Sequence, residues 1–155
     1  MSPDNPSSLE PSVLEAFLHE KIPLTRNMGI RVIESGTQRL ILEAPLEPNI
    51  NHLGSAFGGS LHALPTLACY AALWMLLREA GLDGHVVVKK SCAHYRQAVK
   101  GPLRAVCTRP PAETIADFFS DLRRNQKARM ELDSLVEGHN GKPAVKFHGT
   151  FVALL

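Results

Sequence analysis

The sequence has few cysteines, little net charge and only one long apolar run. Its 155 residues include three cysteines, Cys69, Cys92 and Cys107, which are widely spaced and form no CxxC pair. We therefore expect no disulfide framework, and we predict reduced cysteines in a cytoplasmic protein. The 17 Lys and Arg residues nearly balance the 15 Asp and Glu residues. This balance disfavours an electrostatic nucleic-acid binder, which concentrates basic residues in a patch.

Several functional motifs are absent as well. The N-terminus shows neither the basic region nor the apolar region of a secretory signal. The apolar run at residues 61–77 carries a histidine and a proline and falls short of a normal membrane span, so we predict a buried helix and no membrane contact. The seven histidines form no HxH or HxxxH pair, and no P-loop, GxGxxG or GxSxG is present. We expect neither a metal nor a resident cofactor.

The sequence pattern predicts one domain of ordinary size at residues 12–155, after a flexible tail at residues 1–11 that is rich in Pro, Ser and Asn. Ser12 and Glu15 have the spacing of a capping box, so a first helix is expected from Ser12, with Pro23 ending it. Hydrophobic periodicity and turn residues predict the rest. We expect strands at 30–34 and 39–44, a long helix at 61–80, strands at 85–95 and 103–107, an amphipathic helix at 112–124, and strands at 127–133 and 145–153.

This order of elements predicts an α+β fold in which a curved antiparallel sheet wraps around the long helix. The helix at residues 61–80 is apolar on almost every side in its first turns, so protein should surround it. A single sheet leaves one face and two edges uncovered. Pairing with a second copy is therefore expected, as a homodimer or a dimer of dimers.

Two segments resemble a known family. Residues 51–61 read NHLGSAFGGSL, and residues 95–103 read YRQAVKGPL. The first is similar to the N-x-x-G-x-x-H-G-G segment of hotdog-fold acyl-CoA thioesterases, at the same spacing. The second resembles the run that ends the third hotdog strand, with Gln97 and Ala98 replacing its usual Arg-Pro. The resemblance is closest to the thioesterase family typified by the C-terminal domain of YiiD proteins, over residues 12–155. It implies a hotdog dimer with a small-molecule thioester as substrate, coenzyme A being part of that substrate.

The glycine pair Gly58-Gly59 is the most informative feature of the first segment. A helix that begins at two glycines exposes backbone N–H groups at the positive end of its dipole, where a ligand can approach closely. A thioester carbonyl placed there would have its developing oxyanion stabilised. We therefore predict the Gly59 N–H as a catalytic group, with Gly58 and Ser60 binding substrate. The alternative interpretation is tight packing of the helix start against a partner strand.

The other candidate catalytic residues come with alternatives. Asn51 matches the family's Asn, which implies a role in orienting the attacking water or the carbonyl, although Asn is also common in turns. Phe57 stands where many relatives have His, so it would line a substrate channel or only pack. Thr66 occupies the position of the family's usual Asp or Glu and cannot supply a carboxylate. Its hydroxyl could hold a water, although a Thr in a helix more often bonds back to its own carbonyls. His62 is the first substitute base, and the alternative is a hydrogen-bonded core histidine.

Basic residues of the later strands suggest a site for the phosphates of coenzyme A. Lys89, Lys90, Arg96 and Arg104 are expected to cluster on adjacent strands, although exposed lysines that discourage edge pairing explain them as well. Tyr95 ends its strand near the expected dimer interface. The main hypothesis is hydrolysis of an acyl-CoA or a related thioester. The alternative is a non-catalytic module that binds acyl groups or acyl-CoA.

Overall fold

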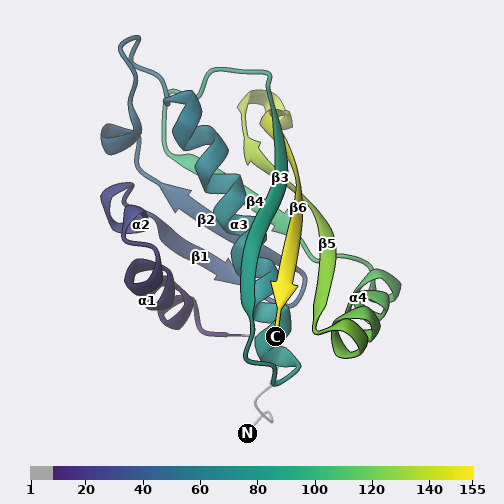
Figure 1. Cartoon of the computed structure of the whole chain (residues 1–155). Coiled ribbons are helices and arrows are strands. Elements are labelled where there is room, and N and C mark those ends of the chain that lie inside the picture. Colours follow the sequence, from purple (N-terminus) through teal and green to yellow (C-terminus); the bar gives the residue numbers. More distant parts are fainter. Residues whose placement is uncertain (1–8) are drawn as a thin grey trace, which may run out of the picture.

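The computed structural model describes residues 9–155, so residues 1–8 of the predicted tail lie outside the described part. Six strands form one sheet in the order β1-β2-β4-β5-β6-β3, and every neighbouring pair is antiparallel. The strands are β1 (Arg31–Ser35), β2 (Arg39–Ala44), β3 (His85–Tyr95), β4 (Leu103–Thr108), β5 (Lys127–Glu137) and β6 (Pro143–Leu154). Figure 1 shows the long strands β3 and β6 passing in front of the lower part of the central helix, with β5 to their right.

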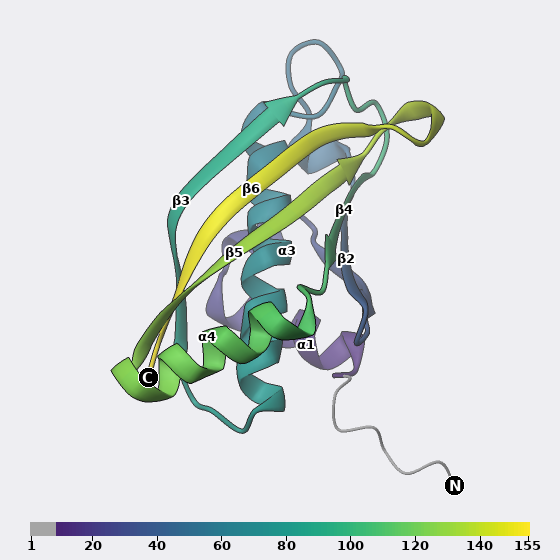
Figure 2. The ribbon, with the colours of Figure 1, turned by 90° about the vertical axis from the view of Figure 1, so that its right-hand side faces the viewer.

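The central helix α3 (Gly58–Glu79) runs through the hollow of the sheet, and Figure 2 shows the strands curving around it. Its buried side chains point in every direction from its axis, because the residues from Leu67 to Leu77 that are buried follow no single helical face. By length and composition this helix could cross a membrane, yet 67% of its most apolar window is buried inside the fold. The predicted hotdog architecture, with a curved sheet around a sheathed helix, is confirmed.

The N-terminal helix differs from expectation in how it begins. Helix α1 (Pro11–Lys21) starts one residue before Ser12, and no side chain caps it. The predicted capping box is wrong, because Glu15 accepts a hydrogen bond from the backbone N–H of Val32 on β1 at 2.9 Å. The carbonyl of Leu9 accepts a hydrogen bond from the Ser35 hydroxyl, so the chain is already attached to the domain before the helix. A short helix α2 (Leu24–Asn27) follows, with Pro23 at its N-cap.

Local signals in the second half of the chain predicted its elements well. Helix α4 (Ala112–Asn125) covers the outside of the structure between β4 and β5 and buries Phe118 and Leu122 (Figure 2). Asn140 and Gly141 both have positive φ, at 57° and 69°, in a short 3-10 turn η2 (His139–Gly141) between β5 and β6. These are the conformations that an Asn-Gly turn favours. A second 3-10 turn, η1 (Glu47–Asn49), precedes the loop that leads to α3.

Candidate active site at the start of α3

The first backbone N–H groups of α3 have no protein partner. The first hydrogen bond of the helix runs from Leu61 N–H to the Phe57 carbonyl, at 3.0 Å. Within residues 9–155, the N–H groups of Gly58, Gly59 and Ser60 donate to no backbone or side-chain acceptor. Gly59 is exposed to solvent. The structure therefore leaves a set of amide donors at the positive end of the helix dipole, where they are open to an incoming oxygen.

Two aromatic side chains border these amides. The Phe57 ring is 56% exposed and lies so close to Gly59 that a Cβ at Gly59 would overlap it. Tyr95, at the end of β3, donates its hydroxyl hydrogen to the Gly58 carbonyl at 3.0 Å. The tyrosine thus engages a carbonyl and leaves the neighbouring N–H groups unpaired. Both rings remain more than half exposed, so they stand at the mouth of the site.

Asn51 holds the loop that precedes α3. Its Oδ1 accepts hydrogen bonds from the N–H groups of Leu53 at 2.8 Å and Ser55 at 3.1 Å, and its Nδ2 donates to the Ser55 hydroxyl at 3.0 Å. These contacts use both ends of the side-chain amide, as in an Asx turn. They give Asn51 a structural task within the loop, and its predicted role in orienting water stays a prediction.

His62 lies one turn into α3 and faces β3. Its Nε2 is 3.0 Å from the hydroxyl of Ser91, and its ring meets the Phe147 ring edge-on at 5.4 Å between centroids. Thr66 donates its hydroxyl hydrogen to the His62 carbonyl at 2.7 Å, which is the usual back-bond of a helical threonine. The position that carries a carboxylate in related thioesterases is therefore engaged with its own helix, and His62 is the nearby group that can accept a proton.

The sequence pattern does not mark Ser91 as a site residue, because a β-bulge changes the phase of β3. The pairing of β3 with β6 shifts between Val88 and Lys90. Without the bulge, strict alternation from the buried Val86 would turn Lys90 toward α3. With the extra residue, Ser91 and Tyr95 face α3 instead, as their contacts with that helix show. The only signal in the sequence was a serine amid a strand otherwise rich in large side chains.

The basic residues do not form the single cluster that was expected. Strand β4 is not a neighbour of β3, and Arg104 pairs with Glu43 and Glu137, each at 3.4 Å. Arg96 lies beyond the end of β3 and is exposed. Lys90 is on the outer face of the sheet, where its charge acts on Glu131. The predicted cluster with Arg104 is wrong because adjacency in sequence does not predict adjacency in the sheet.

Lys89 lines a surface hollow of about 360 Å³ at the other end of β3. Lys127 and Arg129 of β5 share this hollow, and no acidic residue lines it; the apolar lining residues are Val87, Val88, Val152 and Leu154. A larger hollow of about 610 Å³ lies beside the start of α4. Residues 57–62 line neither of these two hollows.

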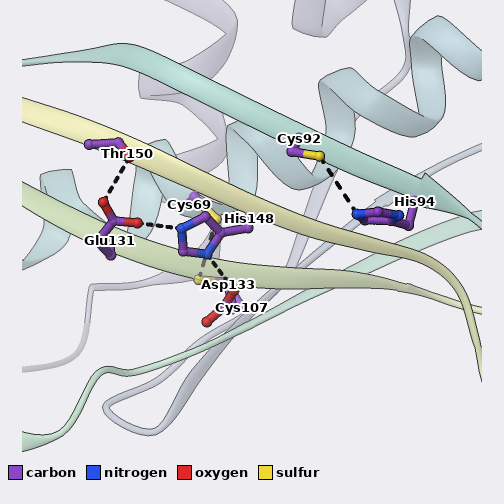
Figure 3. A network of polar contacts seen from close by, with 8 residues as sticks. All are labelled: Cys69, Cys92, His94, Cys107, Glu131, Asp133, His148 and Thr150. Carbon is purple, nitrogen blue, oxygen red and sulfur yellow. Dashed lines mark hydrogen bonds and ion pairs between the residues drawn. The ribbon is translucent and has the colours of Figure 1, made fainter.

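A polar network lies on the outer face of the sheet, shown in Figure 3. His148 Nδ1 is 2.8 Å from an Asp133 oxygen, and its Nε2 contacts Glu131. Asp133 and then Glu131 raise the pKa of His148, whereas hydrogen bonds from Thr150 and His148 lower the pKa of Glu131. In the described part of the chain, no group of three His, Cys, Asp or Glu residues is arranged to hold a metal ion.

The three cysteines are free thiols in this structure. Cys69 of α3 and Cys107 of β4 are buried, with their sulfur atoms 3.9 Å apart. The contact with Cys107 and burial raise the pKa of the Cys69 thiol, which keeps it protonated. Cys92 is exposed on the outer face of β3, and its sulfur is 3.7 Å from His94 Nε2 (Figure 3).

A curved antiparallel sheet of six strands around a long helix is the architecture of the hotdog thioesterases. The family described as "Putative thioesterase (yiiD_Cterm)" matches residues 12–155, and this chain belongs to that family. It is similar to a protein of unknown function from Chlorobaculum tepidum TLS, with 33% identity, a TM-score of 0.89, and 96% of this chain and 98% of that one covered.

Two solved structures described as thioesterases are also similar. One is a "putative thioesterase" from Shewanella oneidensis, with 26% identity and a TM-score of 0.83, covering 94% of this chain and 97% of that chain. The other is a thioesterase from Haemophilus influenzae, with 13% identity and a TM-score of 0.71, covering 95% of this chain and 92% of that chain. The second likeness shows the fold alone. The family and the likeness to the Shewanella protein support a thioester hydrolase.

Proposed function

We propose that the protein hydrolyses acyl-CoA or a related thioester at the start of α3. The observation that carries the proposal is the set of unpaired N–H groups at Gly58, Gly59 and Ser60. A thioester carbonyl that accepts from the Gly59 N–H would be polarised, and the charge that develops on its oxygen would be stabilised by the helix dipole. The exposure of Gly59 supports this role, because a substrate oxygen can reach its amide.

His62 is the proposed base. Its side chain contacts the neutral groups of Ser91 and Phe147, and no carboxylate within residues 9–155 forms a hydrogen bond or ion pair with it. Its side chain leans toward the start of the helix, as side chains on helices do, and therefore toward the free amides. Phe57 and Tyr95 would flank the bound thioester. Thr66 would stabilise the helix at His62 through its back-bond and take no part in proton transfer.

We propose that two copies assemble through β3 into a homodimer, or a dimer of such dimers. β3 is an edge strand of 11 residues, and Val86 is its only buried residue in the single chain. A long exposed edge is normally covered. Phe57 and Tyr95 are more than half exposed in the single chain, which supports walls supplied by a second copy. Antiparallel pairing of two β3 strands would place the Lys89 end of one beside the Tyr95 end of the other.

The phosphates of coenzyme A have a candidate site in the hollow lined by Lys89, Lys127 and Arg129. Its three cations and its apolar lining are suited to a nucleotide, which carries both phosphate and a flat base. Lys90 and Arg96 lie outside this hollow, so their part in substrate binding would be limited to attraction at longer range.

A cytoplasmic location is also proposed. It is supported by three free cysteines, one of which, Cys92, is exposed. The apolar composition of α3 is explained by its burial in the core of the fold.

The test is an assay of the purified protein against acyl-CoAs of different chain lengths, with a reagent that reports free thiol. Release of thiol well above the rate in buffer is expected for at least one chain length, and it should fall on substitution of His62. Rates equal to buffer for every acyl-CoA would contradict hydrolysis.

The second candidate function is binding of acyl-CoA without catalysis, and the observation that favours it is Thr66 in place of a carboxylate. Thermal unfolding with a non-hydrolysable acyl-CoA analogue separates the two functions when it accompanies the assay. Stabilisation by the analogue without thiol release would establish binding alone.

A further inference from the structure

Ser91 and His62 form a pair that the family resemblance does not explain. The Ser91 hydroxyl lies 3.0 Å from His62 Nε2, within the distance at which a base takes a proton from a nucleophile. Of the two β3 side chains that face α3 with a polar atom, Tyr95 bonds a carbonyl, and Ser91 bonds an imidazole. Ser91 is exposed, so a ligand can reach its oxygen.

The surroundings of the pair fix the orientation of the imidazole. Gly149 is the register partner of Ser91 on β6. A Cβ at Gly149 would overlap the Phe151 ring and press on the Phe147 ring, so the missing side chain leaves room for both rings. Phe147 in turn meets the His62 ring edge-on. Packing against Phe147 and the contact with Ser91 therefore hold the imidazole without a third, acidic residue.

The pair also lies close to the free amides of α3. Gly58 and His62 are four residues apart and share one face of the helix, and one turn rises about 5.4 Å. Tyr95 contacts Gly58 on that face, which confirms that it is turned toward β3. A thioester carbonyl at the Gly59 N–H would therefore lie within about one helical turn of His62, the partner of Ser91.

We infer that Ser91 is the nucleophile of a two-step hydrolysis, an inference that rests on the proposed function. The Ser91 oxygen bonds to the thioester carbon as His62 Nε2 takes the hydroxyl proton. The carbon–sulfur bond then breaks, and the coenzyme leaves as a thiolate that takes the proton from His62. Water then attacks the acyl-serine ester as His62 accepts its proton. The bond from the carbon to the Ser91 oxygen breaks, His62 returns the proton to that oxygen, and the carboxylic acid leaves. A thiol leaves readily, since its ordinary pKa is near 8.5, so a dyad suffices.

The inference is tested with a fluorophosphonate reagent, which phosphonylates activated serines with loss of fluoride. Wild-type protein and the variants Ser91→Ala, His62→Ala and Cys92→Ala are incubated with the reagent and mapped by mass spectrometry of their peptides. We expect stoichiometric label on Ser91 in the wild type and in Cys92→Ala, and none in the other two. Cys92 is the matched control, because it is the next residue on β3, faces the outer side and has its own histidine at 3.7 Å.

Acyl-CoA turnover is measured on the same four proteins. Ser91→Ala should lose at least about 10²-fold in thiol release, the scale of a missing nucleophile or base, while Cys92→Ala stays within about twofold of wild type. The inference is overturned if Ser91 takes no label, if the label is on Cys92, or if Ser91→Ala releases thiol at the wild-type rate. Label on Ser91 without any thiol release would show that His62 activates the serine, and it would contradict the proposed hydrolysis.

Discussion

Two histidines of this protein face opposite sides of one sheet, and their neighbours differ in charge. His62 contacts Ser91 and Phe147, which are both neutral. His148 stands on the outer face between Asp133 and a second carboxylate, and these hold its pKa above the ordinary value. An imidazole stabilised as imidazolium has no free lone pair with which to accept a proton. A histidine between carboxylates thus favours its protonated form, and is less available to accept a proton than one with neutral neighbours.

The largest effect is expected when each of the two histidines is replaced in turn, which tests whether their roles differ. His62→Ala should lower thiol release from acyl-CoA by about 10²–10⁴-fold, because the attacking group loses its positioned base. His148→Ala should stay within about twofold of wild type, since His148 lies on the outer face of the sheet. Initial rates with the thiol reagent measure both. Equal losses in the two variants would show that the effect comes from stability and not from chemistry.

A second variant makes the surroundings of His62 resemble those of His148. Thr66 is one helical turn from His62 and faces the same side, so Thr66→Asp places a carboxylate near the imidazole. The carboxylate should stabilise the imidazolium form. The pH at which activity rises should therefore move upward relative to wild type. The measurement is the pH profile of kcat/KM, with Thr66→Asn as the matched uncharged control, whose profile should not move.

The elements that the sequence predicted well are those with local causes. The helix at Ala112–Asn125 follows from apolar residues such as Phe118 and Leu122 at helical spacing, and the turn at Asn140-Gly141 follows from the backbone freedom of those two residues. The free amides at Gly58 and Gly59 belong to the same kind, because a helix start leaves its first N–H groups unpaired wherever no residue caps it.

The features that the sequence did not reveal have non-local causes. Glu15 has the spacing of a helix cap, yet it accepts a hydrogen bond from β1, a contact that depends on how the helix packs. Arg104 is near the lysines of β3 in sequence and three strands away in the sheet. Ser91 faces α3 only because a bulge between Val88 and Lys90 shifts the alternation of β3. Nothing in the sequence of the strand marks that bulge.

A smaller effect is expected from removing the hydrogen bond between Tyr95 and Gly58. Tyr95→Phe removes the hydrogen bond to the Gly58 carbonyl and should lower the free energy of unfolding by about 0.5–1.5 kcal/mol, toward the lower end because Tyr95 is half exposed. Tyr70→Phe is the matched control, since the described structure records no hydrogen bond for the Tyr70 hydroxyl. Urea unfolding measures both. An equal change in the two variants would mean that the contact with Gly58 contributes nothing measurable.

The smallest effect is the pH dependence that the outer network adds to stability. The raised pKa of His148 contributes stability that is present below pH 6.5, the ordinary value, and is lost as pH rises through the raised one. The lowered pKa of Glu131 contributes stability that is present above pH 4.5 and is lost as pH falls through the lowered one. The difference in unfolding free energy between wild type and His148→Gln should therefore peak between pH 4.5 and 6.5. Because the network is exposed, added salt should reduce this peak. A difference that is flat from pH 4 to 9 would mean that the two carboxylates do not favour the charged histidine, and the contrast with His62 would then be one of position alone.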